Sequence, residues 1–121
     1  MTQRTPFIAG NWKMHKTVEE AEEFIAAFLP RVYAAESVDM AICVPYTSLT
    51  AMVDSTRGSR VGVYAQNMHH AAEGAYTGEV SAGMLNELDV HGVVLGHSER
   101  RGACSGRRRQ RATRASSRPW R

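Results

Sequence analysis

The sequence predicts an α/β fold in which four parallel strands form one sheet within residues 1–101. Two observations lead to this prediction. Short apolar runs alternate with segments of helical periodicity in the order β-α-β-α-β-α-β, which in one sheet implies parallel strands joined by right-handed crossovers. Polar segments follow the apolar runs directly, and in parallel architectures the loops at the carboxyl ends of strands carry function.

The first half of this pattern gives a strand near 6–11, a helix, and a strand over 38–44. The capping box Thr17-Val-Glu-Glu20 opens the helix, whose apolar residues recur at helical spacing. Pro30 is expected to close or bend that helix, because proline removes an intrahelical hydrogen bond. Pro45 stops the second strand.

The second half gives a short helix over 47–54, a strand over 60–66, and a polar, glycine-containing loop over 67–78. A helix over 80–88 and a strand over 92–96 complete the pattern. Each strand is a short apolar run, as expected for a buried parallel strand. We therefore expect four parallel strands in the order 1-2-3-4.

The charge is divided unevenly along the chain. Residues 1–101 hold 8 Lys and Arg against 12 Asp and Glu, a net of −4, whereas residues 102–121 hold seven Arg and no acid, a net of +7. The second segment has no Leu, Ile, Val, Phe or Met, so it cannot contribute much to a core. The sequence thus predicts a folded domain over 1–101 and a disordered basic tail over 102–121.

The tail leaves two interpretations open. A frameshift is the first, because the composition changes abruptly at 101/102. The second is a binding protein whose segment Arg107–Arg111 engages nucleic acid, with Trp120 stacking on a base. Charge runs are most often solvated, so we do not expect nucleic acid as a partner.

Other features exclude classes of protein. No apolar run approaches the roughly 20 residues of a membrane helix, and the N-terminus has no apolar signal region. Cys43 and Cys104 form no disulfide framework, which favours a reducing cytoplasm, and Cys43 reads as a core residue. The adjacent His69 and His70 point apart and have no partner at metal-ligand spacing, so neither metal nor cofactor is expected.

Four motifs at the predicted strand ends, in this order, resemble the triosephosphate isomerase family. They are Ala9-Gly-Asn-Trp-Lys-Met14, Tyr64-Ala-Gln-Asn67, Gly74-Ala-Tyr-Thr-Gly-Glu-Val-Ser81 and Val94-Leu-Gly-His-Ser-Glu-Arg-Arg101. The resemblance covers residues 5–101. It implies the N-terminal half, four β/α units, of a (β/α)8 TIM barrel. It also implies a cytoplasmic isomerase of glycolysis and gluconeogenesis, interconverting dihydroxyacetone phosphate and D-glyceraldehyde 3-phosphate through an enediol.

The resemblance implies that His97, Lys13 and Glu99 are catalytic and that Asn11 and Lys13 bind substrate. Physically, the Lys13 ammonium can face a phosphate or a developing enediolate oxygen, although a loop lysine can also be merely solvated. A neutral His97 at a helix N-terminus can donate to a carbonyl, although a lone histidine more often serves its own strand end. Glu99 stands beside Arg100 and Arg101 and could form a surface ion pair with them, whereas the resemblance implies that it lies near Lys13.

The resemblance also implies a homodimer and a missing group. In the family, the loop around Thr77 and Gly78 inserts into a neighbouring subunit. The general base is a glutamate after the sixth strand, and nothing in these 121 residues corresponds to it. We therefore expect this chain to be inactive alone on its small triose phosphate substrate, and the sequence leaves open whether it folds or dimerises.

Overall fold

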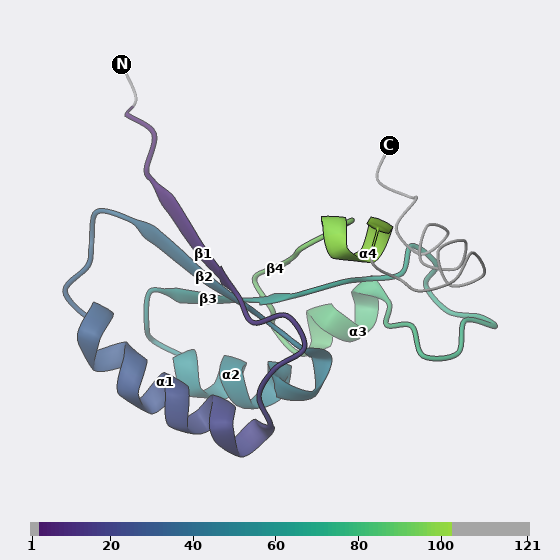
Figure 1. The fold of residues 1–121 in the computed structure, drawn as a ribbon, viewed down its shortest axis with the longest axis horizontal. Coiled ribbons are helices and arrows are strands. Elements are labelled where there is room, and N and C mark those ends of the chain that lie inside the picture. The colour runs from purple at the N-terminus through teal and green to yellow at the C-terminus, as the bar shows by residue number, and fades with distance from the viewer. Residues whose placement is uncertain (1–2, 103–121) are drawn as a thin grey trace.

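The computed structural model describes residues 3–102 and contains a four-stranded sheet in the order β1-β2-β3-β4 (Figure 1). The strands are β1 Phe7–Asn11, β2 Asp39–Val44, β3 Val61–Ala65 and β4 Gly92–Val93, and each adjacent pair is parallel. The predicted fold class and strand order are confirmed. The predicted tail lies, but for Gly102, outside the described residues.

The fourth strand is shorter than the predicted 92–96. Its ladder joins Tyr64 to Gly92 and Ala65 to Val93, and the Val94 N–H still donates to the Ala65 carbonyl at 2.8 Å. Gly96 then takes φ +61, a left-handed conformation that ends the extended backbone. This turn is what separates β4 from the residues that follow it.

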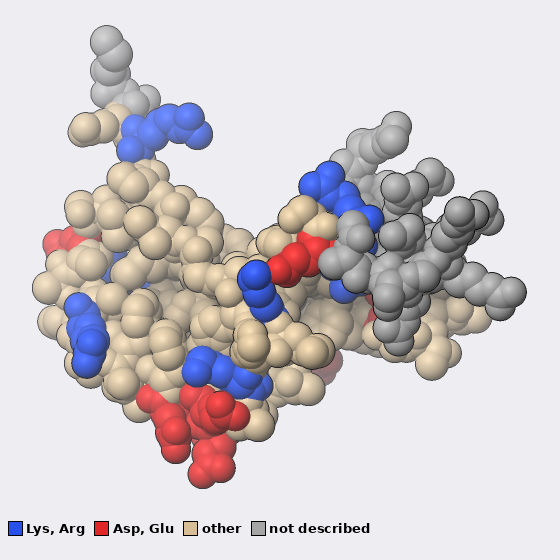
Figure 2. All heavy atoms as spheres, in the orientation of Figure 1, with Lys and Arg blue, Asp and Glu red and all other residues tan. Residues whose placement is uncertain are grey.

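Four α-helices accompany the strands in the described residues: α1 Val18–Val32, α2 Leu49–Thr56, α3 Ala82–Glu87 and α4 Ser98–Gly102. A 3-10 helix, η1 Tyr46–Ser48, directly precedes α2. The capping box is present, since Thr17 Oγ1 accepts from Glu20 N at 3.3 Å and Glu20 Oε1 accepts from Thr17 N at 3.2 Å. The acidic side chains of the first turn suit the positive end of the helix dipole, and Figure 2 shows acidic groups gathered where α1 begins.

Three helix boundaries differ from the prediction. The helix α2 spans Leu49–Thr56 rather than 47–54, because the 3-10 turn η1 precedes it. The helix α1 continues through Pro30 to Val32, so Pro30 does not close it. Near a C-terminus proline removes one intrahelical bond, and the residues after it can still donate to the preceding turn. The helix α3 is shorter than the predicted 80–88, because Ser81 caps it by accepting from Met84 N at 3.4 Å.

The core lies between the sheet and one layer of helices. Figure 1 shows α1 and α2 together beneath the strands. The buried residues of this cluster come from both layers: Ala21, Ile25, Ile42, Val44, Leu49, Met52, Val53, Val61, Val63, Ala65 and Leu85. By contrast, β1 is exposed along its length, with Phe7 56% and Ile8 59% exposed. Within the described residues, the sheet is therefore packed well on one face only.

Candidate active site

The carboxyl ends of the strands meet at a small cavity of about 130 Å³. All four residues that the sequence singled out for chemistry line it: Asn11 at the end of β1, Lys13 just after it, and His97 and Glu99 after β4. A larger cavity of about 970 Å³ lies at the opposite ends of the strands, beside Met40 and Val61, and holds none of these four residues. We take the smaller cavity as the candidate site, because the chemically competent side chains converge there.

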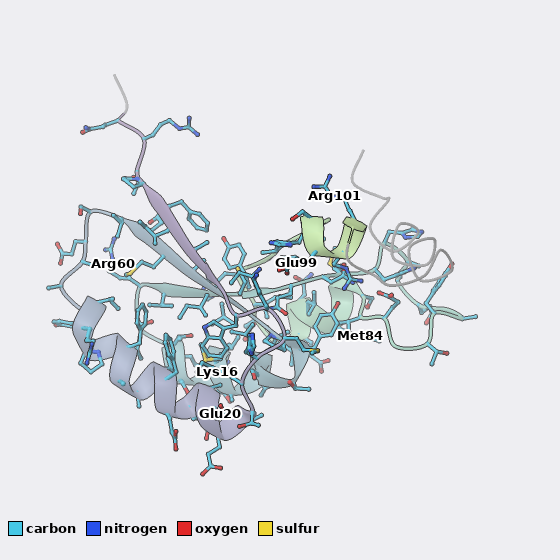
Figure 3. The ribbon with its side chains drawn as sticks, in the orientation of Figure 1. Lys16, Glu20, Arg60, Met84, Glu99 and Arg101 are labelled. Atoms are coloured by element: carbon cyan, nitrogen blue, oxygen red, sulfur yellow. The ribbon has the colours of Figure 1, made fainter. Side chains whose placement is uncertain are left out.

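Lys13 sits in a tight turn directly after β1. Its backbone has φ +58, which is the left-handed region, and its N–H donates to Asn11 Oδ1 at 2.9 Å. The Lys13 ammonium lies 2.7 Å from Glu99 Oε1. Figure 3 shows Glu99 on the side of α4 nearer the sheet, with Arg101 on the opposite side. Glu99 therefore pairs with Lys13 across the site.

The Lys13–Glu99 pair holds both groups in their charged forms. The hydrogen bond from Glu99, and then its charge, raise the pKa of Lys13. The hydrogen bond from Lys13 lowers the pKa of Glu99. Both side chains are about half exposed, at 57% and 45%, so water screens the attraction. The pair orients the ammonium rather than stabilising the fold strongly.

His97 lies at the start of α4, as predicted, and its carbonyl accepts from Arg100 N at 2.9 Å. Its Nδ1 accepts from the Glu99 backbone N–H at 3.2 Å and stands 3.5 Å from Glu99 Oε2. The first contact requires an unprotonated Nδ1 and the second, as an ion pair, a protonated one. The backbone hydrogen bond is the shorter, so it sets the tautomer and leaves the ring proton on Nε2. His97 can then donate a hydrogen bond from Nε2.

Gln66 also lines this cavity, and the sequence analysis did not name it as a site residue. It follows β3, and its Nε2 lies within donor distance of the Lys13 carbonyl (2.8 Å), Asn11 Oδ1 (3.2 Å) and the Cys43 carbonyl (3.1 Å). The signal that could have found it is its position, since a polar residue directly after a buried strand lies at the functional edge of a parallel sheet.

Thr77 and Gly78 lie apart from this cavity. They are exposed, in the long connection between β3 and α3, and Gly78 takes φ +90. In the same connection His69 is buried, its Nδ1 accepts from Ala71 N, and its ring lies tilted against that of Tyr76, with centroids 4.0 Å apart. The prediction that His69 and His70 point apart is wrong, because their rings stack with centroids 4.4 Å apart. Residues 3–102 hold no group of three or more metal-ligating side chains. No described helix is long and apolar enough to cross a membrane. Cys43 is buried in β2, as predicted.

Comparison with known proteins points to one family. The family model of triosephosphate isomerase matches residues 6–117. A triosephosphate isomerase of Synechocystis sp. is 54% identical over 99 residues, which cover 81% of this chain and 41% of that protein. One from Symbiobacterium thermophilum is 52% identical over 98 residues, covering 81% and 38%.

A solved structure agrees with these sequence matches. The crystal structure of triosephosphate isomerase from Bartonella henselae superposes with a TM-score of 0.75 at 39% identity, covering 82% of this chain and 40% of that one. The chain therefore spans about two fifths of the length of the relatives it matches.

Proposed function

Because this chain belongs to the triosephosphate isomerase family, we propose that its cavity supplies the electrophilic side of a site that interconverts dihydroxyacetone phosphate and D-glyceraldehyde 3-phosphate. The observation that carries the proposal is the convergence of the Lys13 ammonium and the His97 imidazole on one cavity. Glu99 supports both, since it pairs with the ammonium and its backbone N–H sets the tautomer of the imidazole.

These residues fit the charge changes of an aldose–ketose isomerisation. When a proton leaves the carbon beside the carbonyl, negative charge builds on the carbonyl oxygen and an enediolate forms. The Nε2–H of His97 donates to that oxygen, and the Lys13 ammonium stabilises its charge. His97 can then move a proton between the two oxygens of the enediol, because its Nε2 can both give and take a proton.

The carbon-bound proton needs a base, and the described part of the cavity does not offer a suitable one. Glu99 is the only carboxylate among the described residues that line it. It is engaged by Lys13, which lowers the pKa of Glu99 and makes it a weak base. We therefore assign the base to a part of the barrel beyond residues 3–102, in the region of the relatives that this chain does not match.

A fused protein tests the proposal. Residues 1–101 are joined to the part of the Synechocystis relative that has no counterpart here, and turnover is measured by a coupled assay in protein from a host without its own isomerase. We expect turnover from the fusion and none from the 121-residue chain, since a positioned base contributes roughly 10²–10⁴-fold. Lys13→Ala in the fusion should lower kcat/KM about 10²–10³-fold, as loss of an oxyanion donor does.

The control is Lys16→Ala, because Lys16 lies over the Trp12 and Phe24 rings and does not line the cavity. It should leave turnover unchanged. A folded fusion without activity would contradict the proposal. Turnover by the 121-residue chain that disappears with Lys13→Ala would overturn the assignment of the base and point to Glu99 or Glu79.

The finer points follow from family membership. We propose a small triose phosphate as the partner in solution, a cytoplasmic location, and a homodimer in which the loop at Thr77 and Gly78 enters a neighbouring subunit. Sedimentation of the fusion should show a dimer, and Thr77→Arg should shift it toward a monomer by crowding that contact.

The alternative of nucleic-acid binding through Arg107–Arg111 gains no support from the comparisons, and that segment lies outside the described residues.

A further inference from the structure

Gln66 joins three strand ends through one amide group. Its Nε2 reaches the Lys13 carbonyl just after β1 at 2.8 Å, Asn11 Oδ1 at the end of β1 at 3.2 Å, and the Cys43 carbonyl in β2 at 3.1 Å. An amide has two N–H groups, so the three acceptors share them, and the shortest contact is to the Lys13 carbonyl. This side chain therefore ties the turn that bears the lysine to the rest of the sheet.

We propose that Gln66 is a positioning residue that fixes the backbone of Lys13 so that the ammonium reaches Glu99 and the cavity. The inference rests on the proposed function, because it concerns the lysine of that same site. It assigns no chemical step to Gln66 itself.

The backbone of Lys13 shows why such a tie is needed. At φ +58 the residue lies in the left-handed region, which residues other than glycine, asparagine and aspartate rarely adopt. The conformation persists only where surrounding groups hold it. Here the Lys13 N–H donates to Asn11 Oδ1 at 2.9 Å, and the Lys13 carbonyl accepts from Gln66. Both polar backbone groups of the strained residue are thus held by side chains.

The direction of the lysine side chain depends on that backbone. A residue that relaxed to an ordinary negative φ would swing its Cα–Cβ bond and carry the ammonium away from Glu99 Oε1, now 2.7 Å distant. Gln66 also contacts Asn11 Oδ1, the oxygen that receives the Lys13 N–H. Removing the Gln66 donor would therefore loosen Lys13 at both of its backbone contacts.

The sequence makes this testable, because Lys13 and Lys16 are the only lysines among the 121 residues. Protein labelled with ¹³C at the lysine Cε position gives two signals, which Lys16→Arg assigns. The full chain is titrated as wild type, Gln66→Met and Gln66→Leu. Methionine keeps the length without a donor, and leucine likewise offers no donor and adds no charge beside Lys13.

We expect the titration midpoint of Lys13 to fall in both variants toward its ordinary value of 10.5, because the contacts to Glu99 that raise the Lys13 pKa are lost. The Lys16 signal should titrate alike in all three proteins. Glu99→Gln sets the endpoint, since it removes the carboxylate while His97 and Arg100, which line the same cavity, remain. The Gln66 variants should lie between wild type and this endpoint.

Two outcomes would overturn the inference. An unchanged Lys13 midpoint in variants with a dispersed amide spectrum would show that the lysine keeps its place without Gln66. Loss of the dispersed spectrum in both variants would show that Gln66 holds the sheet rather than the lysine. Neither result depends on turnover, so an inactive fusion would contradict the proposed function and leave the titration result standing.

Discussion

Replacing Gly92 by alanine should destabilise the strand pair that leads to His97. Gly92 stands opposite Tyr64 in the β3–β4 ladder. A Cβ at Gly92 would lie 2.6 Å from Tyr64 Cε2 and 3.0 Å from Cδ2 and Cζ. Carbon atoms pack best about 3.5–4.0 Å apart, so the ring would have to move by about 1 Å.

The size of the effect follows from how freely Tyr64 can move. Its side chain is half-buried, and its ring centroid lies 6.0 Å from that of the exposed Phe7, so the ring can turn toward open space. Overpacking of a core typically costs about 1–3 kcal/mol, and this partial relief places Gly92→Ala at about 1–2 kcal/mol. Because β4 has only two residues, the displacement should reach the turn before His97.

Urea unfolding of the full chain measures the free energy of unfolding. An unchanged slope of that free energy against urea concentration shows that unfolding exposes the same surface in the variant and in the wild type. Gly10→Ala is the matched control, because Gly10 also lies in a strand and its added Cβ would meet nothing within 4 Å. That variant should be neutral or up to about 1 kcal/mol more stable, since alanine loses less backbone entropy than glycine.

A double-mutant cycle isolates the clash. In a Tyr64→Ala background the ring is gone, so Gly92→Ala should behave like Gly10→Ala. The reasoning fails if Gly92→Ala matches Gly10→Ala in the wild-type background, or if its cost is the same with and without the Tyr64 ring.

Three further predictions concern the core, the first helix and the ion pair. Leu49 is fully buried, so Leu49→Ala should lower the free energy of unfolding in urea by about 2–5 kcal/mol, and a loss below 1 kcal/mol would contradict the packing described here. Thr17→Ala removes the cap of α1 and should cost about 1 kcal/mol in the same assay, whereas an unchanged midpoint would show that the cap is dispensable. The difference in urea midpoint between wild type and Glu99→Gln should depend on pH at both ends of the scale. The lowered pKa of Glu99 gives a contribution present above 4.5 and lost as pH falls through the folded-state pKa. The raised pKa of Lys13 gives one present below 10.5 and lost as pH rises through the folded-state pKa. A difference that stays constant from acid to alkaline pH would argue against the pair.

Local sequence predicted the backbone well where local forces decide it. The capping box at Thr17 formed as expected, since its groups lie three residues apart and find each other within one turn. Prediction failed where the pattern did not fix the end of an element. The helix α1 continued past Pro30, and β4 ended at Val93, shortly before the turn at Gly96.

The sequence by itself determined the order of the elements and the edge of the sheet at which Asn11, Lys13, His97 and Glu99 gather, because parallel strands bring their carboxyl ends together. It left open whether Glu99 pairs with a neighbouring arginine or across the site, and it did not single out Gln66. Only the tertiary structure decided these points, since they depend on distances between strand ends remote in sequence and on the left-handed backbone of Lys13. Periodicity and spacing describe which face a residue occupies, whereas a hydrogen bond at 2.8 Å requires the register and twist of the assembled sheet.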